Sequence, residues 1–149
     1  MQTGCRPEPS ANAIRAAKSS GLIDDEGITF VHAFFPIGKG KMFVAGIDRA
    51  AIEDYVAGER QRAIDELTAF LDANALSSSR MRVEDGGPFE IISRVVEDMR
   101  PDLLVIGTHG RSGLLKMLLG SVTEEALRKL DVDILAVPPV RSLPEAASG

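Results

Sequence analysis

The sequence predicts an α/β fold in which helices flank a parallel β-sheet. Strand-like and helix-like segments alternate along the chain, which is the pattern of folds built around a parallel sheet. The strand-like segments are also apolar at consecutive positions, as expected of strands that are covered on both faces. The chain has 149 residues and no internal repeat or linker, so we expect a single domain.

The composition is that of an ordinary globular protein and excludes several kinds of partner. Lysine and arginine number 17 against 22 aspartates and glutamates, and the resulting net charge of −5 disfavours nucleic acid and anionic membranes. Cys5 is the one cysteine, so neither an intrachain disulfide nor a cysteine-based zinc site can form. No apolar run approaches the roughly 20 residues that span a bilayer. The first ten residues do not follow the plan of a signal peptide, and we expect a cytoplasmic protein.

The first predicted elements are a helix and a strand. Residues 10–20 predict a helix that Ser10 caps and that Gly21 ends. Residues 27–35 (GITFVHAFF) predict a strand, because this β-branched and aromatic run is too short for a helix. The proline and two glycines of residues 36–40 then predict a loop.

A long amphipathic helix is predicted to begin near Asp48. Its apolar residues recur at helical spacing and are expected to face the core: Ile52, Val56, Ala63, Leu67 and Phe70. Its charged residues are expected to form a solvated face: Asp54, Glu59, Arg60, Arg62, Asp65 and Glu66.

A short strand and a further helix follow. Residues 81–83 predict the strand, and Pro88 opens the helix near its first turn. The helix is predicted to bury a stripe of four residues: Ile92, Val95, Val96 and Met99. It is expected to end at Arg100, because Pro101 biases the preceding residue out of the helical region.

The last third of the chain predicts a strand, a helix and a strand. Residues 103–106 (LLVI) form the clearest strand signal. Ser121 and Glu124 have the spacing of a capping box, for a helix that runs to about Leu130. Residues 133–138 predict the final strand.

Chemistry is expected at the glycine-rich segment 107–113, directly after a predicted strand. Ligands of open parallel sheets bind beyond the carboxyl ends of the strands, and glycines let backbone N–H groups approach an anion. Gly120 and Ser121 lie at a predicted helix start, where free N–H groups and the helix dipole favour negative charge. With Arg111 as a cation, the two segments predict a phosphate-binding site in two parts.

Each of these features also has a simpler interpretation, and on chemistry alone the alternatives stay open. The glycines can be turn residues, Ser121 a helix cap and Arg111 a solvated charge. For His109, a contact with a phosphate and a structural role are equally supported. Neither the Walker loop nor the dinucleotide fingerprint is present. His109 and His32 are the only histidines and have no convincing carboxylate partner, so no metal site is expected.

Residues 102–138 closely resemble the universal stress protein family. The nucleotide signature of that family is Gly-x2-Gly-x9-Gly-Ser/Thr, which is present here as Gly107-x2-Gly110-x9-Gly120-Ser121. The resemblance extends more weakly to ITFVHAF, like the second strand of the family, and to SANAIRAA, like its first helix. It covers the chain from about residue 10 to residue 138.

The resemblance implies a Rossmann-like (adenine nucleotide alpha hydrolase-like) sheet that binds ATP, with or without magnesium. By similarity, Gly107 lies against the ribose, and the backbone at Ala33 meets the adenine. The expected phosphate-binding residues are Gly110, Arg111, Gly120, Ser121 and Val122, with His109 in the same loop. The family also implies a homodimer through the last strand, at Ile134, Leu135, Ala136 and Val137, where pairing would cover an apolar edge.

Residues 1–9 depart from the family pattern. Members begin with an apolar strand followed by Asp-x-Ser, whereas MQTGCRPEP has no such run and contains two prolines. We therefore expect the first central strand to be missing or replaced, which leaves a gap in the middle of the sheet. An altered gene start is the favoured explanation, and filling by the N-terminal segment or by a strand of a partner is the alternative. Lower stability and weaker nucleotide affinity than in a complete member should follow.

The expected organisation is an atypical segment at 1–9, the family domain at 10–138 and a flexible tail at 139–149. The leading hypothesis is a non-catalytic stress-response sensor or regulator that binds ATP or a related adenine nucleotide. Any ATP hydrolysis should be slow, because no general base is identifiable near the glycines. The alternatives are a dimeric interaction module that has lost nucleotide binding, and a nucleotidyl-transferring or phosphate-ester-cleaving enzyme on the same sheet.

Overall fold

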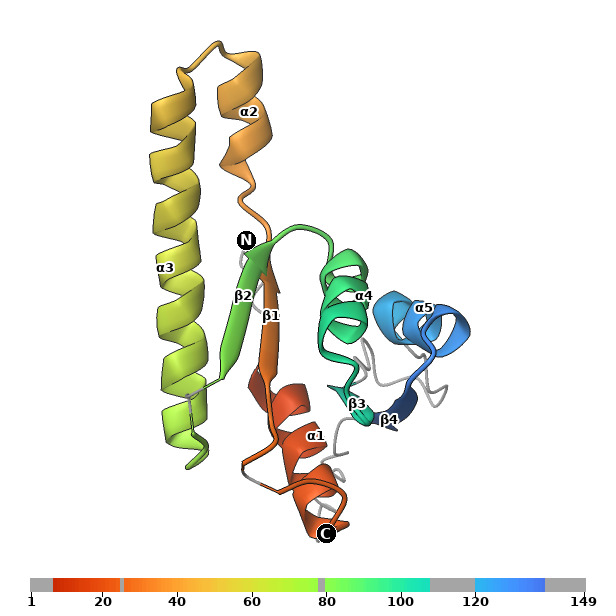
Figure 1. The fold of residues 1–149 in the computed structure, drawn as a ribbon. Helices are drawn as coiled ribbons and strands as arrows, with labels where there is room; N and C mark the ends of the chain where they lie inside the picture. Colours follow the sequence, from red (N-terminus) through yellow and green to blue (C-terminus); the bar gives the residue numbers. More distant parts are fainter. Residues whose placement is uncertain (1–6, 25, 78–79, 108–119, 139–149) are drawn as a thin grey trace, which may run out of the picture. The chain divides into compact units, whose positions relative to one another are not determined.

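The computed structural model describes residues 7–24, 26–77, 80–107 and 120–138 (Figure 1). The chain divides into two compact units, one built from residues 24–100 and the other from the residues before and after that range. The described strands form two parallel pairs, β1 with β2 and β3 with β4. Parallel strands flanked by helices confirm the predicted α/β fold.

The unit of residues 24–100 contains five elements. They are β1 (Phe30–Phe34), α2 (Gly38–Val44), α3 (Arg49–Ala73), β2 (Met81–Asp85) and α4 (Pro88–Met99). The register places Phe30 opposite Met81 and Phe34 opposite Asp85. Both strands therefore end at the same edge of the sheet, and the short loops that follow them meet there.

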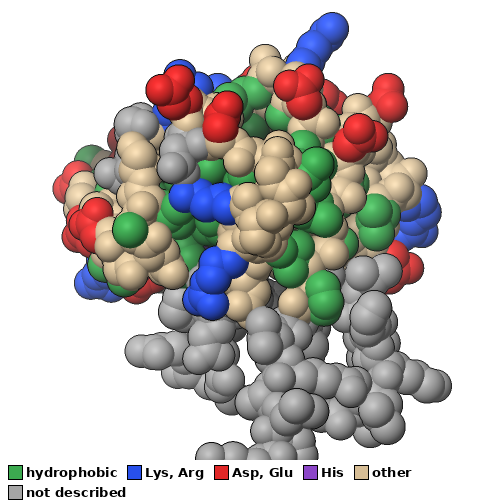
Figure 2. Space-filling view, turned by 90° about the horizontal axis from the view of Figure 1, so that it is seen from below, with side chains coloured by type: hydrophobic (Ala, Val, Ile, Leu, Met, Phe, Trp, Pro, Cys, Tyr) green, Lys and Arg blue, Asp and Glu red, His purple; other side chains and the backbone are tan. Residues whose placement is uncertain are grey.

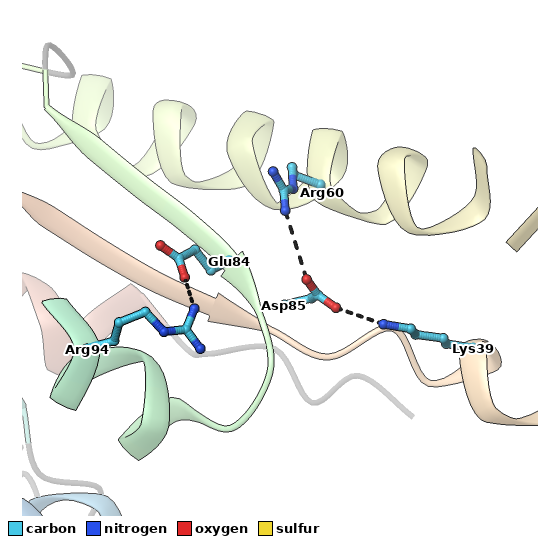
Figure 3. Close-up of polar contacts among 5 residues, drawn as sticks. All are labelled: Lys39, Arg60, Glu84, Asp85 and Arg94. Atoms are coloured by element: carbon cyan, nitrogen blue, oxygen red, sulfur yellow. Dashed lines mark hydrogen bonds and ion pairs between the residues drawn. The ribbon is translucent and has the colours of Figure 1, made fainter. Parts of the chain in front are cut away.

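Helices α3 and α4 cover opposite faces of the β1–β2 sheet. Successive side chains of a strand point to opposite faces, and Figure 3 shows this for Glu84 and Asp85 at the end of β2. Glu84 pairs with Arg94 of α4 at 2.8 Å. Asp85 faces Arg60 of α3, with 3.9 Å between the charged groups. Arg60 thus reaches the strand, although the sequence placed it on a fully solvated helix face.

Helix α3 begins where the sequence predicts. Asp48 is the N-cap, and its carboxylate accepts a hydrogen bond of 2.7 Å from the backbone N–H of Ala51. At the other end, the chain turns through Ala75 with a φ of 53°, and Leu76 N–H closes the turn on Leu71 carbonyl at 2.9 Å. Of the predicted stripe only Ala63 is buried, and Leu71 is buried in addition.

The predicted ends of α4 are confirmed, and its buried stripe is confirmed at Val95 but not at Ile92, Val96 or Met99. Pro88 is the first residue of α4, and Arg100 ends it in the left-handed conformation with a φ of 44°. The buried residues are Ile91 and Val95. Met99, predicted to be buried, is the last residue of α4 and is 42% exposed.

Helix α2 replaces most of the loop predicted for residues 36–40. The glycines of this segment have low helix propensity, and the helix is supported from outside by α3 (Figure 1). Gly38 N–H donates a 3.0 Å hydrogen bond to the Tyr55 hydroxyl. A Cβ atom at Gly38 would lie 2.8 Å from that oxygen, so the close approach of α2 to α3 requires glycine.

The second unit contains α1 (Pro7–Ser19), β3 (Leu103–Gly107), α5 (Ser121–Lys129) and β4 (Asp133–Val137). Helix α1 packs on both strands, and Ala13 and Ala17 are buried in it. The prediction that Ser10 caps this helix is wrong. Because the helix already begins at Pro7, Ser10 lies inside it.

The strands are less covered than the sequence predicts. Every residue of β1, β2 and β3 is half-buried, and in β4 Asp133 is exposed. Figure 2 shows one face of the molecule, on which hydrophobic side chains reach the surface between interspersed acidic and basic groups. Within the described residues each pair has two strands, so each strand has a hydrogen-bonded neighbour on one side. Residues 1–6 lie outside the described part of the chain, so the gap at the first central strand stays a prediction.

Candidate functional site

The strand–helix–strand unit of β3, α5 and β4 brings the two predicted glycine segments to one edge. Leu103 lies opposite Asp133 and Gly107 opposite Val137, so β3 and β4 run parallel and in step. Helix α5 ends shortly before β4 begins and must run back along the strands. Its nine residues rise about 13 Å, close to the roughly 16 Å of a five-residue strand. The start of α5 therefore lies at the edge where β3 ends in Gly107.

Among the described residues, no side chain caps the N-terminus of α5. Gly120 is the N-cap residue, with φ −57° and ψ 152°, and its carbonyl accepts the Glu124 N–H at 3.0 Å. The predicted cap at Ser121 is wrong, because Ser121 is the first helical residue and its side chain is exposed. The N–H groups of a first helical turn have no partner within the helix. No side-chain hydrogen bond from the described residues caps this turn, and the exposed Ser121 lies in it.

Two side chains hold this helix start in place. Thr123 is 2% exposed and Ala126 is fully buried, and they lie three residues apart on one side of α5. A helix that is packed through its first turn presents its N–H groups in a fixed direction. The part of the predicted phosphate site that α5 contributes is therefore preorganised.

The charges of α5 act on this site in opposite directions. Glu124 is exposed and lies in the first turn, where its carboxylate repels a bound anion. Glu125 is neutralised by Lys129 at 2.7 Å. Arg128 and Lys129 lie in the last turn, where cations complement the helix dipole. Among the described side chains of α5, Glu124 is thus the one whose charge opposes the binding of an anion at the helix start.

The other predicted site residues lie elsewhere. Ala33 is on β1 opposite Glu84, in the unit of residues 24–100. His109, Gly110 and Arg111 lie outside the described residues. The structure therefore describes Gly107 with Gly120, Ser121 and Val122 in one unit, and Ala33 in the other.

Sequence reasoning missed a charged cluster at the carboxyl end of β2. Asp85 accepts a hydrogen bond from Lys39 of α2 at 3.1 Å and lies 3.9 Å from Arg60 of α3 (Figure 3). The available signal was Asp85 itself, a carboxylate between a predicted strand and a pair of glycines. Its partners are 46 and 25 residues away in the sequence, so no local pattern connects them.

Of the two histidines, His32 lies in the part of the chain that the structure describes. It is at the centre of β1, opposite Val83. Burial lowers the pKa of His32 below its ordinary value, and the negative charge of Glu66 opposes that shift. The unfolded chain therefore binds a proton near pH 6.5 before the folded protein does. The free energy of unfolding should fall as the pH drops from above about 7 towards the folded pKa, and then level off.

This pH dependence can be measured as the urea midpoint at several pH values between 8 and 5. We expect the wild-type midpoint to fall more steeply with decreasing pH than that of His32→Gln. His109 is common to both proteins and cancels in the difference. Parallel curves would show that protonation of His32 is not coupled to unfolding.

The described ranges of the chain contain neither a metal-binding cluster nor a membrane-spanning helix. No group of three or more histidine, cysteine, aspartate or glutamate side chains is placed there to hold a metal ion. None of the helices in those ranges combines the length and apolarity needed to cross a membrane.

Comparison with known proteins finds one family. The sequence profile described as the Universal stress protein family matches residues 6–138. Universal stress protein A homolog 2 of Coxiella burnetii is 27% identical over 134 residues, which cover 88% of this chain and 87% of that protein. Universal stress protein MJ0577 of Methanocaldococcus jannaschii is 28% identical over 105 residues, which cover 63% of this chain and 61% of that protein.

A third relative is longer, and two solved structures share the fold. The Universal stress protein E homolog of Haemophilus influenzae is 29% identical over 85 residues, which cover 57% of this chain but 28% of that protein. The structure of hypothetical protein MJ0577 superposes with a TM-score of 0.61 at 21% identity and covers 91% of both chains. Hypothetical protein PH0823 gives a TM-score of 0.58 at 16% identity, covering 91% of this chain and 92% of the other.

Proposed function

Because this chain belongs to the universal stress protein family, we propose that it binds ATP or a related adenine nucleotide mainly through the phosphates. It acts as a stress-response sensor or regulator without strong catalysis. The observation that carries the proposal is the uncapped start of α5 at the edge where β3 ends. Gly120, Ser121 and Val122 donate to the phosphates there, and Gly107 lies against the ribose. Gly110, Arg111 and His109 complete the phosphate contacts.

The adenine half of the site is proposed to be weak. Ala33 meets the base through its backbone, but a first strand that ends in Asp-x-Ser, which supplies the adenine-binding carboxylate in the family, has no counterpart in MQTGCRPEP. The phosphates therefore provide most of the affinity, and magnesium enters as their counter-ion. ATP hydrolysis is expected to be slow.

A homodimer through β4 is part of the same proposal. Within the described residues β4 pairs on one side with β3. Ile134, Leu135 and Ala136 are half-buried, and pairing of β4 with a second copy would cover their apolar side chains.

Titration calorimetry with ATP and magnesium tests the phosphate site. A hydrogen bond from a hydroxyl to a charged group contributes about 1.5–3 kcal/mol, so Ser121→Ala should raise the Kd roughly 10- to 100-fold. Gly120→Ala should also weaken binding. Ser19→Ala is the matched control, because that exposed hydroxyl donates to the Ala16 carbonyl of its own helix. Equal affinities for the wild type and Ser121→Ala would refute the site.

Glu124→Gln is expected to change the affinity in the opposite direction. Removal of the first-turn carboxylate ends its repulsion of the phosphates, worth about 0.3–1 kcal/mol near a helix terminus. The Kd for ATP should fall about two- to fivefold, and the gain should shrink at high salt. Unchanged or weaker binding by Glu124→Gln would mean that the phosphates do not lie at this helix start.

The second candidate function is a dimeric interaction module without nucleotide binding. The departure of residues 1–9 (MQTGCRPEP) from the family's first strand favours it, because that strand carries the aspartate that contacts adenine in the family. No heat of binding with ATP, in a protein that sediments as a dimer, is the result that supports this function.

A further inference from the structure

The carboxyl edge of the β1–β2 sheet carries a pocket that the proposed nucleotide site does not use. It has a volume of about 480 Å³ and lies wholly within the unit of residues 24–100. Its apolar walls come from Phe35 after β1, Ile37 and Phe43 around α2, and Ile52 on α3. A mostly apolar pocket of this size, beyond the ends of parallel strands, is where small ligands bind.

The apolar walls are open to solvent to an unusual degree. Phe35 is 73% exposed and Phe43 78% exposed, although both line the same pocket. Single exposed apolar residues are ordinary, but a concave cluster of them marks a binding surface. A ligand that fills the pocket would remove these side chains from water.

A positive rim gives the pocket its charge preference. Lys39 and Asp85 both line it, 3.1 Å apart, and Arg60 approaches the same carboxylate at 3.9 Å (Figure 3). Two cations thus share one carboxylate, and the cluster keeps one positive charge in excess. Lys39 and Arg60 are both about half exposed, so an incoming anion can reach them.

The wall formed by α2 is fixed before any ligand binds. Tyr55 of α3 accepts the hydrogen bond from Gly38 N–H at 3.0 Å, and this contact holds the first turn of α2 against α3. Preorganisation of this kind lowers the entropic cost of binding.

We propose that this pocket binds a small amphiphilic anion, an alkyl or aryl carboxylate whose apolar part contacts Phe35 and Phe43 and whose head group lies at Lys39 and Arg60. The chemistry is that of a free fatty acid or an aromatic acid. The site shares no residue with the proposed nucleotide site, so either can fail without the other.

The test uses decanoate below its micelle concentration, with decanol as the uncharged probe of equal chain length. We expect saturable binding of decanoate by calorimetry and weaker binding of decanol. Lys39→Met should weaken decanoate about two- to fivefold and leave decanol unchanged. Asp85→Asn should tighten decanoate, because it frees both cations. A substitution that merely disturbed the fold would weaken both probes.

Phe43→Ala tests the apolar part of the pocket. Because Phe43 is largely exposed, its loss should not unfold the protein, and both probes should bind about tenfold more weakly. Val44→Ala is the control, since Val44 is 86% exposed on the same helix but does not line the pocket. Ser121→Ala should leave decanoate binding unchanged.

Three results would overturn the proposal. The first is equal affinity for decanoate and decanol. The second is binding to anionic phospholipid vesicles without binding of monomeric decanoate, which would indicate a membrane surface. The third is displacement of decanoate by adenosine, which would make the pocket part of the nucleotide site.

Discussion

Replacement of residues 1–6 by an apolar strand that ends in Asp-x-Ser and leads into α1 is expected to stabilise the protein. The strand would bury apolar side chains, at about 1.5–3 kcal/mol each, and form backbone hydrogen bonds along both of its edges, at about 0.5–1.5 kcal/mol each. Ordering its backbone costs about 1–2 kcal/mol per residue. In the family the first strand lies between the second and the fourth, which correspond here to β1 and β3. The added strand would give both an inner position in one sheet.

Urea unfolding measures this effect in two ways. The midpoint should rise, and the slope m should rise with it, because a continuous sheet exposes more surface on unfolding. Amide hydrogen exchange in β1 and β3 should slow. The control is the same segment with prolines at alternate positions, which cannot pair with a strand. If both inserted segments gave the wild-type midpoint and slope, the gap would not limit stability.

Ile91→Ala should be among the most destabilising single substitutions in the unit of residues 24–100, together with Leu71→Ala. Ile91 is 1% exposed in α4. Its side chain would lie only 3.6 Å from a Cβ built at Gly86. Truncation of a buried isoleucine to alanine costs about 2–5 kcal/mol, through lost burial and the cavity that remains.

The matched control is Met99→Ala on the same helix. Met99 is 42% exposed, so its truncation should change the free energy of unfolding by less than about 1 kcal/mol. The loss in the free energy of unfolding for Ile91→Val should lie between those of the two alanine variants, at about 0.5–1.5 kcal/mol. This milder variant can still be measured if Ile91→Ala does not fold. Equal losses for Ile91→Ala and Met99→Ala would contradict the core position assigned to Ile91.

The elements that sequence reasoning predicted well are those that local chemistry determines. The strands β1, β3 and β4 follow apolar runs, Asp48 caps α3, and Pro101 forces the end of α4 at Arg100. Each of these signals lies within a few residues of the feature that it predicts. The same holds for Gly107 and Gly120, whose positions follow from the strand and the helix beside them.

The elements that sequence reasoning missed depend on contacts between distant residues. Helix α2 contains two glycines and is held by Tyr55, which lies 17 residues beyond Gly38. In the buried stripe of α4 the prediction was right for Val95 but chose Ile92 in place of Ile91, because both isoleucines are apolar and only the packing decides between them. The cluster around Asp85 joins three elements of the chain. These features follow from the tertiary fold and have no local signature.

The measurement closest to the central claim is a titration of ¹⁵N-labelled protein with ATP, followed by the backbone amide shifts, with adenosine as the phosphate-free comparison. If the uncapped start of α5 binds the phosphates, the amides of Gly120, Ser121 and Val122 should shift the most, and Gly107 should follow. Adenosine should leave the α5 amides unchanged. Binding of ATP with no shift at residues 120–122, or equal shifts there with adenosine, would contradict the account.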